Sequence, residues 1–337
     1  MGVILHNHYD LEELEMKEKA MLFPCDRELA SFMDCVDPVN YEIKGLCVLE
    51  DSNVDDLCDI PVFDIGSIDF NLFDVLILVD NAFYSHSFIK DCIERGKKIV
   101  NVEEIEKIDV ENIHAILEKQ SVSVPIIFVM GITPYTEKFH VQIALRKAFA
   151  NNGYKVSQIG SKSYSGLFGF HSYPSFMNEP MDNTERIMLF RKYVKYIEQQ
   201  EQPDLIVIGV PGGIMAVNKK HYFDFGMTAY MVSQAIEPDY VIMSMLYSKS
   251  YTIEQLEEIN QTCKYKFNFE IQSFHLSNTL LDPTSLKSER LTFIKIGNKK
   301  YTEKVDRLYD FLNQEDMNKA FDAMITKLSS YNVNQFF

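Results

Sequence analysis

The sequence predicts an α/β protein with two parallel-sheet domains. Apolar runs of five or six residues alternate with helical patterns along most of the chain. Such runs, when crossover helices separate them, are typical of strands buried on both faces of a parallel sheet. With 337 residues, 46% of them apolar, the chain is also long enough for about two domains with cores of their own.

The first domain is expected over residues 18–118, after a flexible leader at residues 1–17. Strand patterns occur in AMLFPC, YEIKGLCVLED, FDVLILVDN and KKIVNV, and helical patterns in DRELASFMDCV and SHSFIKDCIERG. This alternation predicts a Rossmann-like domain. No G-x-G-x-x-G follows its first strand, so no motif supports a dinucleotide site.

The second domain is expected over residues 122–330, with a boundary inside Val110–Pro125. Strand patterns occur in PIIFVMG, YKVSQIG, PDLIVIGVPGG, PDYVIMSMLY, FEIQSFHLSN and RLTFIKI. Helical patterns lie between them in VQIALRKAFANNG, TERIMLFRKYVKYIEQQ, MTAYMVSQAI and TIEQLEEINQTC, and a last helix is expected around Thr302–Lys327. Ligands of open α/β sheets bind beyond the carboxyl ends of the strands, so the loops there are the candidate sites.

The charge and the apolar pattern exclude several classes of partner. The chain has 33 Lys plus Arg against 49 Asp plus Glu, a formal net charge of −16, and no long basic cluster. Such a chain repels nucleic acids and anionic lipid, so neither is expected as a partner. No apolar run approaches the ~18–20 residues of a membrane span, and we expect a cytoplasmic protein. The six cysteines form no C-x-x-C pair, which favours reduced thiols and no metal site.

The stretch GITPYTEK joins a predicted strand to a predicted helix in the way that a phosphate-binding loop does. Gly131 ends the strand pattern, and Lys138 opens the helix seven positions later. In such loops successive backbone N–H groups and the helix N-terminus face the anion, and the lysine contacts the phosphates. One interpretation of this stretch is a P-loop NTPase-like second domain, with ATP or GTP and Mg²⁺ as its candidate ligands.

The loop departs from the standard G-x-x-x-x-G-K-[ST] pattern. Gly131 lies one position further from the lysine, Glu137 replaces the second glycine, and Phe139 replaces the hydroxyl residue that holds Mg²⁺. A residue at the second glycine position often needs a conformation that glycine tolerates best, and a carboxylate there would lie beside a phosphate. Thr133, Thr136 and Gln142 are candidates to substitute in part. These residues leave a nucleotide site and a structural turn both open.

Three stretches resemble a clostridial family of natural-product peptide maturation proteins, found beside clusters for ribosomally made peptides. They are GITPYTEKFHVQIALRKAFANNGYKVSQIGSKSYSGLFGFHSYPSFM, DLIVIGVPGGIMAVNKK and FGMTAYMVSQAIEPDYVIM, with a weaker match at MLFPCDRELASFM. The resemblance implies an accessory role in peptide maturation, with a precursor peptide or other maturation proteins as partners. It does not specify a reaction, and it leaves oligomerisation open.

The loop is also similar to that of P-loop proteins with the longer spacing G-T-x-x-x-x-G-K, which carry a Rossmann-like domain ahead of the P-loop domain. Gly131 and Lys138 keep their places in that pattern. Glu137 and Phe139 do not, nor does Ile132, and Thr133 falls one position late. The similarity implies an inherited nucleotide site whose loop has diverged.

An aromatic stretch, SGLFGFHSYP, follows the second strand of this domain. His171 is the best candidate for a titrating group in catalysis, because an imidazole changes charge near neutral pH. Tyr164 and Tyr173 are further candidates for contacting a substrate. The alternative is a loop that packs its aromatic rings against the sheet edge.

Two other strand ends carry candidate substrate contacts. Gly212 and Gly213 in GVPGGI allow a close backbone approach to a ligand. The strand before them does not end in an acidic residue that could hold Mg²⁺, and Asp224 is the nearest substitute. Ser277 and Asn278 in FHLSN could read a base or a peptide, although they are also common in turns. A non-catalytic peptide-binding or scaffold protein with a decayed nucleotide site is the alternative function.

Overall fold

The computed structural model describes residues 17–33, 38, 40–49, 58–105, 110–116, 121–297 and 305–329. The expected leader therefore lies outside the described residues, apart from Lys17. The chain forms two compact units, one up to Val102 and one from Glu103 onward.

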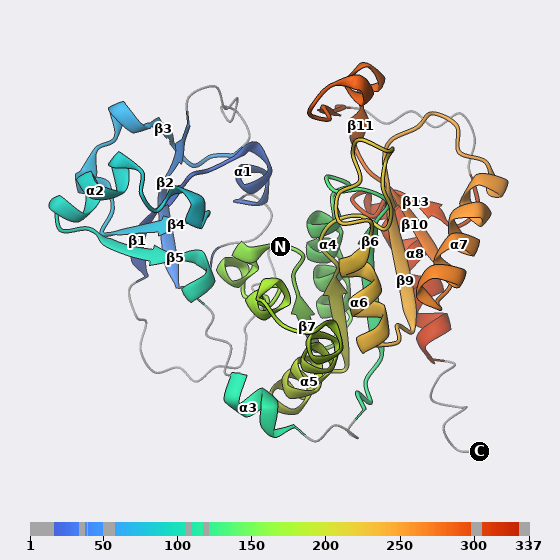
Figure 1. The fold of residues 1–337 in the computed structure, drawn as a ribbon. Coiled ribbons are helices and arrows are strands. Elements are labelled where there is room, and N and C mark those ends of the chain that lie inside the picture. Colours follow the sequence, from blue (N-terminus) through green and yellow to red (C-terminus); the bar gives the residue numbers. More distant parts are fainter. Residues whose placement is uncertain are drawn as a thin grey trace. The chain divides into compact units, whose positions relative to one another are not determined.

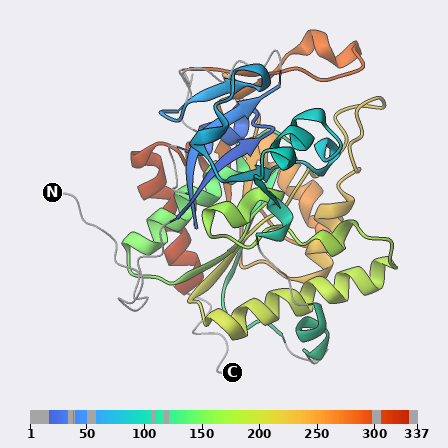
Figure 2. The same ribbon diagram turned by 90° about the vertical axis from the view of Figure 1, so that its left-hand side faces the viewer.

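The first unit is built on a parallel five-stranded sheet in the order β3-β2-β1-β4-β5 (Figures 1 and 2). The fully buried run VLIL forms β4, and Phe73 and Phe88 pack with it in the core. Two helices, α1 and α2, follow β1 and β4. The bounds are β1 Glu18–Phe23, α1 Arg27–Met33, β2 Tyr41–Val48, β3 Val62–Asp64, β4 Val75–Leu78, α2 Ser87–Glu94 and β5 Lys98–Asn101. The strand order is that of a Rossmann-like fold, as predicted.

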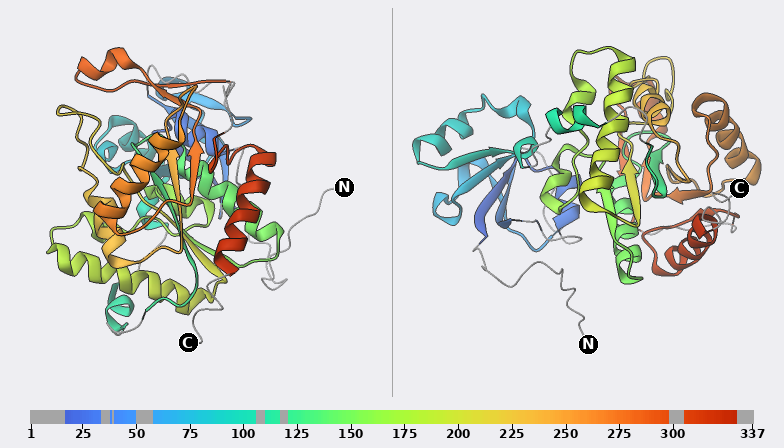
Figure 3. Two further views of the ribbon diagram at one scale, coloured as in Figure 1. Left: turned by 90° about the vertical axis from the view of Figure 1, so that its right-hand side faces the viewer. Right: turned by 90° about the horizontal axis from the view of Figure 1, so that it is seen from below.

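The second unit is built on a parallel six-stranded sheet in the order β13-β10-β9-β6-β8-β7. Helices cover both of its faces (Figure 3). The strands are β6 Ile126–Gly131, β7 Val156–Ile159, β8 Leu205–Gly209, β9 Tyr240–Met245, β10 Ser273–Leu276 and β13 Leu308–Tyr309. The helices are α3 Val110–Ala115, α4 Lys138–Asn151, α5 Asn183–Glu201, α6 Met227–Ala235, α7 Ile253–Phe267 and α8 Gln314–Ser329. The predicted fold class, α/β with two parallel-sheet domains, is confirmed.

Burial on both faces explains why the strands are continuously apolar. In β6, Phe128 and Met130 pack with side chains of α5, α6 and α7. Ile127 and Val129 pack on the other face with side chains of α4 and α8. Side chains alternate along a strand, so Gly131, two positions after Val129, faces the same side of the sheet as Ile127 and Val129, the side of α4.

The sheet has a topological switch point at the neighbouring strands β6 and β9. The chain leaves β6 through α4 toward β7 on one side of the sheet, and leaves β9 through α7 toward β10 on the other. Ligands of open α/β sheets bind at such a point, beyond the carboxyl ends of the strands. The loop that starts at Gly131 lies there.

Three features differ from the sequence expectations. The expected boundary lay within residues 110–125, whereas the two units divide after Val102. The reason is that α3 belongs to the second unit. Lys192 of α5 donates a hydrogen bond to the carbonyl of His114 in α3. The stretch RLTFIKI does not join the parallel sheet. It forms β12 (Phe293–Lys295), which pairs antiparallel with β11 (Thr279–Leu281) in a hairpin. The last helix begins at Gln314 rather than near residue 302.

Candidate functional site

The loop from Gly131 to Lys138 connects the end of β6 to the start of α4. Tyr135 and Glu137 take left-handed backbone conformations, with φ of 64° and 62°. This region costs a residue other than glycine about 1–2 kcal/mol. Glu137 therefore adopts the conformation expected at the second glycine position of a phosphate loop, although it is not glycine.

Gly131 is required by the close packing inside the loop. A Cβ atom at this position would collide with Thr136 Oγ1 and would lie 3.0 Å from Lys138 Nζ. Thr136 Oγ1 donates to the carbonyl of Thr133 at 3.2 Å, which closes the turn. A side chain at position 131 would thus project into the loop, toward the ammonium of Lys138.

The loop has backbone N–H groups without a hydrogen bond among the described residues, and a buried lysine stands at its end. Helix α4 has no side-chain cap at its N-terminus. Within the described part of the chain, the N–H groups of Thr133, Tyr135 and Glu137 donate no hydrogen bond. Lys138 is buried, and its Nζ donates to the carbonyl of Gly212 at 2.6 Å. Unbonded N–H groups at a helix N-terminus beside an ammonium form an arrangement that suits an anion.

The carboxylate of Glu137 is engaged on the side of β10. It accepts hydrogen bonds from the backbone N–H of Asn278 and from Lys295 Nζ, both at 2.7 Å, and lies 3.7 Å from His275 Nε2. Burial alone would raise its pKa, but the contacts with His275 and Lys295 outweigh burial and hold the pKa well below its usual range. Lys138 reaches toward β8 and Glu137 toward β10, on opposite sides of β6. From the sequence we expected this carboxylate beside a bound phosphate, but its partners lie on the other side.

Ser244 at the carboxyl end of β9 was missed from the sequence. It is the register partner of Gly131 on the neighbouring parallel strand, so both residues face α4. Its hydroxyl is fully buried and has no hydrogen-bond partner among the described residues. A buried polar group without a partner costs about 1–3 kcal/mol, which a ligand bound in the loop would recover. The only sequence signal was a lone hydroxyl in the apolar run VIMSMLY.

The turn at Gly212 and Gly213 packs directly on the loop. A Cβ atom on Gly213 would lie 2.8 Å from Thr133 Cα, so this glycine permits the contact. Gly212 has a φ of 74°, and its carbonyl holds Lys138. Thr133 is buried, and its hydroxyl donates to the carbonyl of Pro134. The structure therefore brings these predicted residues together around the lysine.

Gln142 and Phe139 serve the packing of α4. Gln142 is fully buried. Its Nε2 donates to the carbonyl of Ile159, and its Oε1 accepts from the N–H of Ser161. Both ends of its amide are therefore hydrogen-bonded at the end of β7. The ring of Phe139 is buried against Tyr164, with the two centroids 6.1 Å apart, and also contacts Phe168 and Phe170. Tyr164 thus belongs to an aromatic cluster beneath the loop.

His171 lies at the edge of the sheet. Its backbone pairs with β7, and its Nε2 lies 2.7 Å from Glu201 Oε1. Burial raises the pKa of Glu201, but the contacts with His171, Ser157 and Lys155 together outweigh burial, and the net shift is downward. Ser157 also donates to Glu201. Because β8 lies between β7 and β6, the structure does not bring His171 to Lys138.

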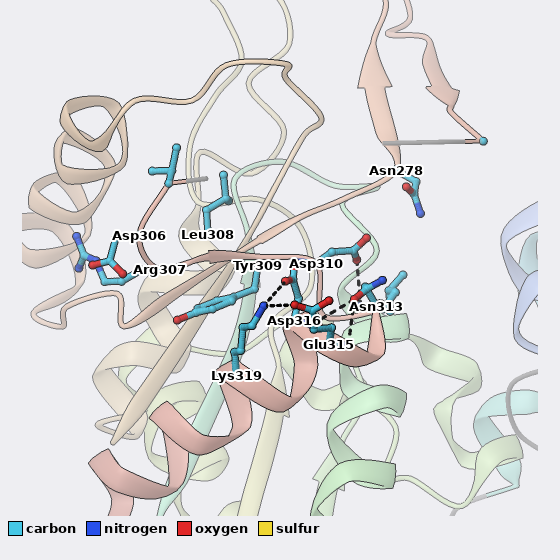
Figure 4. Close-up of a pocket in the computed structure, with 13 residues that line it drawn as sticks. Asn278, Asp306, Arg307, Leu308, Tyr309, Asp310, Asn313, Glu315, Asp316 and Lys319 are labelled. Atoms are coloured by element: carbon cyan, nitrogen blue, oxygen red, sulfur yellow. Dashed lines mark hydrogen bonds and ion pairs between the residues drawn. The ribbon is translucent and has the colours of Figure 1, made fainter. Parts of the chain in front are cut away.

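Ser277 and Asn278 lie at the carboxyl end of β10. Ser277 Oγ accepts from the N–H of Thr279, as in a turn. Asn278 borders a cavity of about 670 Å³ beyond β10 and β13 (Figure 4). The other lining residues are Gly297, Val305, Asp306, Arg307, Leu308, Tyr309, Asp310, Leu312, Asn313, Glu315, Asp316 and Lys319.

The described cysteines are free, and burial raises the pKa of Cys47, Cys92 and Cys263 to about 12, so these thiols stay protonated near neutral pH. Within the described residues, no three His, Cys, Asp or Glu side chains gather as they would around a metal ion that the protein alone holds. None of the described helices is long and apolar enough to cross a membrane.

The chain is similar in fold to one solved structure over most of its length. A DUF1611 family protein from Anabaena variabilis aligns over 81% of this chain and 91% of its own, with a TM-score of 0.51 and 9% identity. FtsY from Elizabethkingia anophelis covers 52% of this chain and 56% of its own, at TM-score 0.31 and 14% identity. Chloroplast FtsY from Physcomitrella patens covers 58% and 66%, with the same TM-score and identity. No family model and no curated protein matches the sequence.

Proposed function

We propose that the loop Gly131–Lys138 binds the phosphates of ATP or GTP. The observation that carries this proposal is the position of Lys138, whose ammonium lies 2.6 Å from the carbonyl of Gly212, beside a loop with unbonded N–H groups. A phosphate oxygen would replace that carbonyl as the partner of the lysine, and the N–H groups of Thr133, Tyr135 and Glu137 would donate to the remaining oxygens.

Binding with slow or no turnover fits the site better than efficient hydrolysis. Position 139 holds a phenylalanine instead of a hydroxyl residue, and β8 ends at Gly209 without an acid to hold Mg²⁺. The imidazole of His171 is engaged with Glu201 at the sheet edge, so it is not available as a base at the loop. The protein would thus hold a nucleotide as a structural or signalling ligand.

In the cell, the nucleotide-binding protein would assist maturation of a ribosomally synthesised peptide. This proposal depends on the resemblance of GITPYTEK and its flanks to the clostridial maturation proteins. The alternative, a peptide-binding or scaffold protein, draws support from exposed apolar side chains near α6. Tyr222 and Phe225 stack with ring centroids 4.8 Å apart, and both are at least half exposed. Exposed aromatic rings are common in protein-binding surfaces.

Equilibrium binding of ATP and GTP tests the proposed function. Lys138→Ala should weaken binding by at least about tenfold, because it removes the ammonium that would pair with the phosphates. Lys147→Ala is the matched control, since Lys147 is an exposed lysine on the same helix. If wild type shows no saturable binding up to millimolar nucleotide, the loop is a structural turn, and the alternative function as a peptide-binding or scaffold protein is favoured.

A further inference from the structure

Asp224 lies against the same glycine turn that holds Lys138. A Cβ atom built on Gly212 would lie 3.7 Å from Asp224 Oδ1 and 3.8 Å from Oδ2. The carbonyl of this glycine accepts from Lys138 Nζ. A carboxylate and an ammonium from segments far apart in the sequence thus meet at one residue, at the carboxyl ends of the strands.

The backbone holds the Asp224 carboxylate in a fixed orientation. Its Oδ1 accepts from the N–H of Gly226 at 3.0 Å, and its Oδ2 from the N–H of Thr228 at 2.9 Å, at the start of α6. A carboxylate has about four acceptor positions, so each oxygen can still take a further partner. The two flanking residues, Phe223 and Phe225, are both left-handed, with φ of 47° and 57°. Left-handed residues that are not glycine are unfavourable and concentrate at functional sites.

Tyr173 provides a second, independent observation. Its hydroxyl is buried and has no hydrogen-bond partner among the described residues. Burial, and after it the charge of Asp224, raise the pKa of this tyrosine well above its usual range. The hydroxyl therefore lies within reach of the charge of Asp224 without a hydrogen bond to it, and a water molecule between the two groups would satisfy it.

We propose that Asp224 binds the Mg²⁺ ion of the bound nucleotide, in place of the acid missing from the end of β8. Mg²⁺ keeps several waters and needs only one or two carboxylates besides the phosphate oxygens, so a single aspartate suffices. A water of the ion would hydrogen-bond to the Tyr173 hydroxyl. This inference depends on the proposed nucleotide site, because the phosphates supply the remaining ligands.

The competing explanation is that Asp224 only caps α6, and Asp224→Asn separates the two roles. Asparagine keeps one of the two acceptor oxygens that hold the backbone N–H groups of Gly226 and Thr228, but it lacks the charge that attracts Mg²⁺. Affinity for ATP and for GTP is measured with excess Mg²⁺ and with EDTA. We expect Mg²⁺ to strengthen wild-type binding by about tenfold or more, and Asp224→Asn to lose most of that gain while keeping the affinity in EDTA.

Asp182→Asn is the control, because the Asp182 carboxylate also accepts from a backbone N–H, that of Thr184, at the start of a helix, α5. It should keep the full Mg²⁺ effect. The inference is overturned if Asp224→Asn keeps that effect too, or if wild type binds equally well in EDTA; nucleotide binding itself would then still stand. No nucleotide binding by wild type in either buffer would overturn both proposals.

Discussion

Glu137 shows how one residue can occupy a glycine position and remain stable. Its left-handed backbone is unfavourable, but its buried carboxylate accepts two hydrogen bonds at 2.7 Å from Asn278 and Lys295. These contacts hold the loop in the conformation that glycine would reach without a side chain. The sequence pattern alone suggested a damaged motif, because the partners of the carboxylate lie more than 100 residues later in the chain.

Replacing Glu137 by alanine and by glycine should separate its backbone cost from its side-chain contacts. Both variants lose the carboxylate, but only alanine keeps a Cβ atom in the left-handed conformation. We expect Glu137→Ala to be less stable than Glu137→Gly by about 1 kcal/mol in urea denaturation. Equal stabilities would show that the backbone is relaxed at this position.

The pH dependence of stability should report the lowered pKa of Glu137. A carboxyl group whose pKa is lower in the folded state stabilises the protein above its unfolded pKa, and that stabilisation is lost as pH falls toward the folded value. The unfolded value is 4.5. The stability difference between wild type and Glu137→Gln should therefore be constant near neutral pH and shrink below about pH 4.5. A difference that grows on acidification would contradict the assigned contacts with His275 and Lys295.

Phe139, the residue after the loop, is buried in the core at the start of α4. Its ring is 1% exposed and packs on the aromatic rings of Tyr164, Phe168 and Phe170. Phe139→Ser would restore the standard motif, but we expect it to lower the free energy of unfolding by about 3–5 kcal/mol. Phe139→Leu, which keeps most of the apolar volume, should cost less than about 1.5 kcal/mol. Similar losses in the two variants would mean that the ring is not tightly packed.

At the scale of elements, the start of α6 depends on one capping side chain. Asp224 accepts from the N–H groups of Gly226 and Thr228, which precede or open that helix. Asp224→Ala, which removes both acceptors, should lower stability by about 1 kcal/mol, and Asp224→Asn, which keeps one acceptor, should lower it by less, as measured by thermal denaturation. A loss in the asparagine variant as large as that in the alanine variant would contradict the capping role.

Long elements were predictable from the sequence and short ones were not. The apolar periodicity placed α5 and α7 and the fully buried strands β6 and β9, because burial on known faces fixes the pattern. The β11–β12 hairpin was not predicted, because a strand of three residues is too short for its sequence pattern to indicate which strand it pairs with. It matters for the site, since Lys295 at its end holds Glu137.

At the scale of the whole molecule, the candidate site is assembled from strand ends that are distant in the sequence. Gly131 and Lys138 were found from their spacing, and Gly212 was found from its turn. Ser244 joins them only through sheet order, which no local pattern encodes. Asp224 was named from the sequence as the nearest acid after that turn, and loop packing brings it to Gly212. The same limit explains why His171 and Gln142 looked functional, although their side chains are engaged elsewhere.

The most direct test of the central claim is the amide NMR spectrum of the loop during titration with ATP. If phosphate binds to the loop, the N–H signals of Thr133, Tyr135 and Glu137 should shift together and saturate in wild type. They should stay unchanged in Lys138→Ala at the same ATP concentrations. Saturable shifts confined to residues around the cavity at Asn278, with none in the loop, would contradict the claim.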